Sequence, residues 1–167
     1  MNQTHFAFLF NYFKGDKIMS ESILTQQLDA LLQGENNIIA NLANASALLN
    51  EHLSNINWVG FYLYDQETNT LNLGPFQGKV ACMHIPLGQG VCGSAIAEQK
   101  ILRVANVHEF AGHIACDAAS NSEIVLPLIK NGEILGVLDI DSPELNRFSA
   151  HDEQELAAFV TTLLKHI

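Results

Sequence analysis

The spacing of apolar residues changes near Asn57, and this change constrains the fold more than any other feature of the sequence. Before that point, apolar residues recur three and four positions apart, as one face of an α-helix requires. This spacing predicts a helix over residues 21–33, capped by Ser20 and ended by Gly34, and a second helix over residues 36–54. We expect both helices to pack on one face of a sheet.

After Asn57 the sequence has the features of β-strands. Aromatic and branched residues dominate residues 58–64, and a polar turn leads into residues 71–73, so this segment predicts a hairpin. Further strands are expected at residues 81–85, 101–104, 124–129 and 133–141. The last two flank Asn131-Gly132, a dipeptide typical of a tight hairpin turn.

Two more helical segments complete the pattern. A short helix is expected near Val91, and a capping box over residues 149–152 begins a final helix. This order of elements predicts an α+β fold, in which an antiparallel sheet carries helices on its faces. A chain of 167 residues can bury one core without disulfides or metal, and no repeat or linker divides it.

The charge distribution argues against nucleic acids and membranes as partners. The formal net charge is -10, and the eight Lys and Arg residues are scattered, so anionic phosphates and lipids are repelled. No apolar run approaches the roughly 20 residues that span a bilayer, and the start of the chain lacks the basic segment of a signal peptide. We therefore expect a cytoplasmic protein, whose cysteines serve catalysis or metal binding rather than structural disulfides.

Three cysteines occupy positions that suit reactive thiols. Cys82, Cys92 and Cys116 each border a loop or the end of an expected element. A free cysteine can also be an ordinary small apolar residue of the core. This alternative applies most to Cys92, at the start of the expected short helix, and least to Cys116, whose neighbours are small and polar.

A zinc site is an alternative use of the same cysteines. Soft ligands occur at Cys82 and His84, at Cys92, and at His113 and Cys116. None of these residues has the spacing of a zinc finger. One bound zinc per purified chain would favour this alternative.

Acidic and aromatic pairs are expected to share faces of two strands. Asp139 and Asp141 alternate along one strand, so both point to the same side. Trp58 and Tyr62 do the same around Gly60, where the missing side chain would leave room for a ligand. The alternatives are an exposed acidic strand end and ordinary aromatic core.

These segments together resemble the GAF domain family, in which a strand like residues 135–142 precedes a closing helix. Residues 57–62, 88–93, 116–128 and 139–142 further resemble the family of free methionine-(R)-sulfoxide reductases, and the likeness extends over about residues 23–164. GAF domains also serve as non-enzymatic sensors of small molecules, so the fold alone does not decide the function. A sensor, however, needs no trio of cysteines.

The resemblance implies a thiol mechanism. Cys116 would attack the sulfoxide sulfur, and Cys82 or Cys92 would condense with the resulting sulfenic acid to form a disulfide. Thioredoxin would then reduce that disulfide. The resemblance also implies a homodimer, and we expect neither a cofactor nor a metal.

The resemblance assigns the carboxylates of the substrate site as well. Asp139 would bind the substrate ammonium, and Glu123 and Asp141 would contact the sulfoxide oxygen. One carboxyl group would stay protonated because its neighbours carry like charge.

The remaining substrate contacts implied by the resemblance are apolar and backbone contacts. Trp58 and Tyr62 would form the wall around the terminal methyl group, and backbone amides near Tyr62, Ile114 and Ala115 would hold the substrate carboxylate. We expect residues 20–167 to form the catalytic domain. Residues 1–19 have no counterpart in the family pattern, and we expect a non-native or loosely packed extension there.

Overall fold

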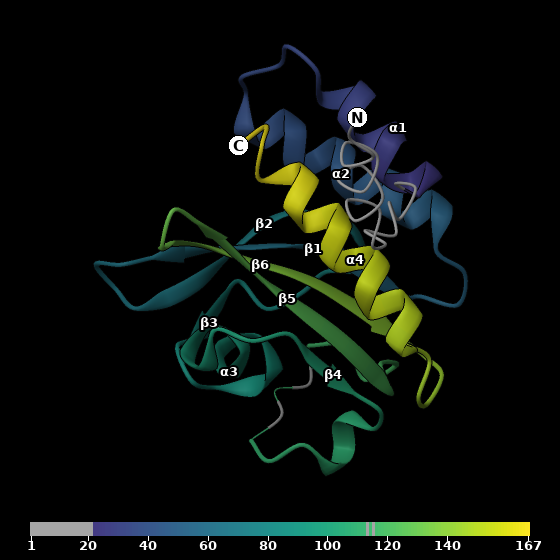
Figure 1. Cartoon of the computed structure of the whole chain (residues 1–167). Helices are drawn as coiled ribbons and strands as arrows, with labels where there is room; N and C mark the ends of the chain where they lie inside the picture. The colour runs from purple at the N-terminus through teal and green to yellow at the C-terminus, as the bar shows by residue number, and fades with distance from the viewer. Residues whose placement is uncertain (1–21, 113, 115) are drawn as a thin grey trace, which may run out of the picture.

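The computed structural model of the chain describes residues 22–112, 114 and 116–167. The expected extension over residues 1–19 and the expected cap Ser20 lie outside the described residues, as do His113 and Ala115. The described part has the α+β architecture that the sequence predicts, with helices on both faces of one antiparallel sheet (Figure 1).

In the part of the chain that the structure describes, three α-helices lie on one face of the sheet and one lies on the other (Figure 1). The first face carries α1 (Ile23–Leu32), α2 (Ile38–His52) and α4 (Ala150–Leu163), and the opposite face carries α3 (Gly90–Glu98). Both expected N-terminal helices are confirmed, with ends that differ by a few residues. None of the helices in the described ranges is long and apolar enough to cross a membrane.

Capping side chains set the starts of α1, α2 and α4. The hydroxyl oxygen of Ser22 accepts a hydrogen bond from the amide of Thr25, so α1 begins at Ile23 with Ser22 as its cap. Ser149 and Asp152 form the predicted capping box at the start of α4.

Six strands form a single sheet within the described ranges. They are β1 (Trp58–Asp65), β2 (Thr70–Gly78), β3 (His84–Pro86), β4 (Leu102–Val104), β5 (Ser122–Lys130) and β6 (Glu133–Ser142). Their order is β3-β2-β1-β6-β5-β4, and every neighbouring pair is antiparallel. The predicted turn between β5 and β6 is confirmed, since Asn131 and Gly132 have φ values of 54° and 83°. The strand predicted over residues 81–85 begins later, at His84.

The alternation of side chains along the strands divides the interior into two layers. Val59 and Phe61 of β1 belong to the apolar cluster beneath α1, α2 and α4, whereas Trp58 and Tyr62 belong to the cluster beside α3. The central strands β1 and β6 approach closely at Gly136, where an added Cβ would lie 2.0 Å from the carbonyl oxygen of Tyr62. The layer beside α3 holds the predicted site residues.

Candidate functional site

A disulfide joins Cys82 to Cys116, whose Cα atoms are 5.4 Å apart. Cys82 lies in the loop between β2 and β3, and Cys116 lies in the long loop between β4 and β5. Both are half-buried, whereas Cys92 is a free thiol with 3% of its surface exposed. The sequence left two partners open for Cys116, and the structure pairs it with Cys82.

A tyrosine fixes the first of these loops. The hydroxyl group of Tyr62 donates a hydrogen bond of 3.1 Å to the carbonyl oxygen of Cys82. Together with the disulfide, this contact holds Cys82 against the pocket instead of in the sheet, which explains why β3 starts at His84.

A polar network fixes the second loop. The amide nitrogen Nδ2 of Asn57 donates to Oδ2 of Asp117 at 3.1 Å and to Oγ of Ser120 at 3.0 Å. The amide of Ala119 donates to Asp117 Oδ1 at 2.9 Å, and this bond is the main reason why the pKa of Asp117 is lowered. Lys79 Nζ lies 3.9 Å from the same carboxylate.

Sequence reasoning did not assign roles to Asn57, Asp117 and Ser120. A signal for the loop existed in Asp117, because an aspartate before small residues favours a turn that its own side chain closes. No comparable local signal marks Asn57, which acts on residues about sixty positions away.

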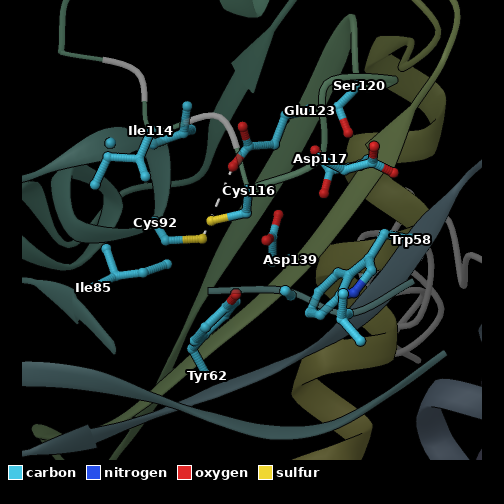
Figure 2. A pocket seen from close by; sticks show the side chains of 15 residues that line it. Trp58, Tyr62, Ile85, Cys92, Ile114, Cys116, Asp117, Ser120, Glu123 and Asp139 are labelled. Carbon is cyan, nitrogen blue, oxygen red and sulfur yellow. Dashed lines mark hydrogen bonds between the residues drawn. The ribbon is translucent and has the colours of Figure 1, made fainter. Parts of the chain in front are cut away.

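The two loops, α3 and the sheet enclose a pocket (Figure 2). It brings together all of the predicted site residues that are described except Cys82, which is attached through the disulfide: Trp58, Tyr62, Cys92, Ile114, Cys116, Glu123, Asp139 and Asp141. Ala115 lies outside the described residues. The predicted residues therefore converge from four separate parts of the chain.

Three carboxyl groups of the sheet line this pocket, in addition to Asp117 of the loop. Glu123 and Asp141 face each other across β5 and β6, and Asp139 is two residues along β6 on the same side. Glu123 and Asp139 are 5% and 6% exposed, so their ionised forms lose most of their hydration. No cation compensates them among the described residues that line the pocket.

Burial raises the pKa of all three carboxyl groups, but not equally. The pKa of Asp139 rises from 3.8 to about 6, mainly because of burial. The pKa values of Glu123 and Asp141 are raised well above their ordinary values by burial and then by the charge of Asp139. Ionisation of Asp139 therefore favours the protonated forms of Glu123 and Asp141.

Cys92 lies deeper in the same pocket than the disulfide. Its Sγ is 3.9 Å from Oε1 of Glu123 (Figure 2). Burial, followed by the charges of Asp139 and Glu123, raises the pKa of this thiol well above its ordinary value. A thiol that stays protonated is a poor nucleophile, so the burial of Cys92 argues against it as the attacking thiol.

Aromatic rings form one wall of the pocket. The rings of Trp58 and Tyr62 stack at 5.8 Å between centroids, and Trp58 stacks on Phe76 at 5.3 Å. The expectation that Gly60 leaves room for a ligand is wrong, because an added Cβ would lie 2.3 Å from Cβ of Phe76 and 2.7 Å from the ring of Trp58. The glycine serves the packing of these rings.

The zinc ligands considered from the sequence do not come together. Cys82 and Cys116 are bonded to each other, and Nδ1 of His84 lies 2.7 Å from Oδ1 of Asn72. His113 lies outside the described residues. In this form of the protein, the two outer sulfurs are not available to a metal.

Comparison with known proteins agrees with this site. Residues 41–164 match the GAF domain family. The chain is 57% identical over 142 residues to the free methionine-R-sulfoxide reductase of Escherichia coli K12, covering 85% of each protein. It is 44% identical over 161 residues to the free methionine-R-sulfoxide reductase of Saccharomyces cerevisiae, covering 91% of this chain and 88% of the relative.

A solved structure extends the likeness to three dimensions. The free methionine-R-sulfoxide reductase of Neisseria meningitidis, in complex with its substrate, has a TM-score of 0.83 and 42% identity and covers 86% of this chain and 85% of its own. The chain belongs to the GAF domain family and, within it, to the free methionine-R-sulfoxide reductases.

Proposed function

We propose that this protein reduces free methionine-(R)-sulfoxide to methionine with its own thiols. One observation supports this most: the Cys82–Cys116 disulfide lies at a pocket that also contains the buried carboxyl groups of Glu123 and Asp139 and the half-buried one of Asp141. The E. coli and yeast relatives are named for this activity. A ligand sensor would have no need of a disulfide beside its binding site.

Cys116 is the proposed nucleophile. Its thiolate attacks the sulfoxide sulfur, the sulfur–oxygen bond breaks, and the oxygen leaves on Cys116 as a sulfenic acid while methionine is released. The Cys82 thiol then attacks the sulfenic sulfur, which yields the disulfide and one water. The observed pairing supports Cys82 as the thiol that resolves the intermediate.

The carboxyl groups have two separate proposed roles, binding the substrate ammonium and protonating the sulfoxide oxygen. Ionised Asp139 binds the substrate ammonium, and protonated Glu123 and Asp141 donate hydrogen bonds and a proton to the sulfoxide oxygen. This division is supported by the raised pKa of Glu123 and Asp141, whose protonated forms are favoured by burial and by the charge of Asp139.

The apolar and backbone contacts complete the proposed site. The stacked rings of Trp58 and Tyr62 enclose the terminal methyl group. Backbone amides near Tyr62, Ile114 and Ala115 hold the substrate carboxylate.

The catalytic cycle needs an external dithiol. Thioredoxin attacks the Cys82–Cys116 disulfide, passes through a mixed disulfide and leaves both cysteines reduced. We place this cycle in the cytoplasm, in a homodimer whose catalytic domain is residues 20–167. Residues 1–19 are not needed for it.

The decisive experiment compares three substrates side by side. Purified protein with thioredoxin, thioredoxin reductase and NADPH receives free methionine-(R)-sulfoxide, its S epimer or a peptide-bound R epimer. Rapid NADPH oxidation with only the first substrate is expected. Equal rates with the peptide would contradict the proposed function, and no turnover with any of the three would exclude it.

A further inference from the structure

Three potential metal ligands lie close together in the pocket. Sγ of Cys92, a carboxylate oxygen of Glu123 and a carboxylate oxygen of Asp139 all lie within 4.8 Å of one another. Each residue is buried, with exposed fractions of 3%, 5% and 6%. Figure 2 shows the three side chains directed toward a common space.

A second observation points to a ligand there. Oδ1 of Asp139 is buried, lines the pocket and has no hydrogen-bond partner among the described residues. A buried carboxylate oxygen without a partner costs free energy that a bound cation would recover. This oxygen can therefore accept a ligand, while the rest of the carboxylate is hydrogen-bonded to Cys92, Glu123 and the backbone of Ile140.

The separation of the ligands suits a small tetrahedral cation. With Zn–S of about 2.3 Å and Zn–O of about 2.1 Å, a tetrahedral ion holds sulfur and oxygen about 3.6 Å apart and two oxygens about 3.4 Å apart. The observed distance from Cys92 Sγ to Glu123 Oε1 is 3.9 Å. Small side-chain rotations would therefore close the site.

We infer that Cys92, Glu123 and Asp139 bind one zinc ion, which inhibits the protein by occupying the position of the substrate ammonium. The inhibitory part of this inference rests on the proposed function, whereas the binding part does not. Three protein ligands leave a fourth position open toward the pocket for water. Binding displaces the protons of the thiol and the carboxyl groups, because a coordinated thiol is deprotonated.

The ligand set also selects the metal. A thiolate with two carboxylates suits Zn²⁺ and Co²⁺, whereas Mg²⁺ and Ca²⁺ require an all-oxygen shell. Millimolar Mg²⁺ should therefore neither bind nor inhibit.

The disulfide form of the whole protein allows a specific test. With Cys82 and Cys116 bonded, Cys92 is the free thiol. Adding CoCl₂ alone should give a thiolate-to-cobalt charge-transfer band that saturates at about one ion per chain, and added ZnCl₂ should abolish it. Absence of the band in this form would overturn the inference.

Variants identify the ligands. Removing a group that only orients a metal ligand typically weakens metal binding by about 10–100-fold, so losing a direct ligand through Cys92→Ala or Glu123→Gln should weaken it by at least about 100-fold. Far-ultraviolet circular dichroism checks that each variant folds. The Cys82→Ser, Cys116→Ser double variant is the matched control and should keep the band. Loss of the band in the control with retention in Cys92→Ala would assign the metal to the outer cysteines and refute the inference.

An activity measurement addresses inhibition separately. Zn²⁺ should inhibit reduction competitively with free methionine-(R)-sulfoxide, and a chelator should restore the rate. Metal binding without inhibition would refute the inhibitory role, while the inference of a metal site would still hold. A cobalt band without any reductase activity would refute the proposed function, while the inference of a metal site would still hold.

Discussion

Replacing Asp139 with asparagine should stabilise the free protein and impair the reaction. In the folded protein the pKa of Asp139 is about 6 instead of 3.8, and each pKa unit corresponds to about 1.4 kcal/mol. A raised pKa means that the folded state favours the protonated acid. The stability contributed by the protonated form is therefore present below about pH 4 and is lost as the pH rises through about 6.

The magnitude follows from the same pKa values. Ionisation of Asp139 lowers the free energy of unfolding by about 3 kcal/mol at pH 8. Asparagine cannot ionise, so Asp139→Asn should melt about 6–12 °C above the wild type at pH 8, and close to the wild type at pH 4. Thermal unfolding followed by circular dichroism at both values of pH measures this difference.

The reaction should respond in the opposite direction. Without the carboxylate the substrate ammonium is buried unpaired, at a cost of about 3–5 kcal/mol, so kcat/KM for free methionine-(R)-sulfoxide should fall by at least about 100-fold, mainly through KM. Asp65→Asn is the control, because hydrogen bonds from Thr68 and Glu67 lower the pKa of Asp65 and its loss should not stabilise the protein at pH 8. An Asp139→Asn variant that melts no higher than the wild type at pH 8, or that keeps its KM, would refute the reasoning.

The cysteines, the substrate ammonium and the central strands each allow a further test. Cys116→Ser should abolish reduction, Cys82→Ser should release about one methionine per chain and then stop, and Cys92→Ser should sustain turnover. Rapid-quench and steady-state assays with thioredoxin distinguish these three outcomes. A Cys82→Ser variant that turns over repeatedly would contradict the assignment of Cys82 and Cys116 as the reactive pair. N-acetylated methionine-(R)-sulfoxide, which lacks the ammonium, should lose at least about 100-fold in kcat/KM, and equal activity would remove the role of the acidic group. Gly136→Ala should lower the free energy of unfolding by about 3 kcal/mol or more, since its Cβ would overlap the carbonyl of Tyr62. Gly132→Ala, which meets no atom within 4 Å, should cost about 1 kcal/mol, and equal losses in urea unfolding would count against this packing argument.

Local signals in the sequence accounted for most of the fold. The turn at Asn131 and Gly132 and the capping box that begins with Ser149 depend on neighbouring residues, and both are confirmed. The late start of β3 could not be predicted, because it depends on a hydrogen bond from Tyr62 to Cys82 and on a disulfide to a distant loop.

The sequence predicted which residues form the candidate site better than it predicted how they are arranged. The alternation of side chains along a strand is enough to place Asp139 and Asp141 on one face of β6. The choice between Cys82 and Cys92 required the direction in which α3 packs, since this packing buries Cys92 beside Glu123. The position of Asn57 beside the Cys116 loop is likewise a product of tertiary structure.

Because the two faces of β6 carry different kinds of side chain, an error in the strand register would destabilise the folded protein. Leu138 and Ile140 face the apolar layer beneath the helices, and Asp139 and Asp141 face the pocket. A slip by one residue would exchange the two sets, so that two acids would enter a layer without water or partners. Misregistered chains should therefore unfold rather than persist as inactive folded molecules. Specific activity per folded molecule should therefore stay constant during refolding. The enzyme assay would then report the fraction of chains that have folded correctly.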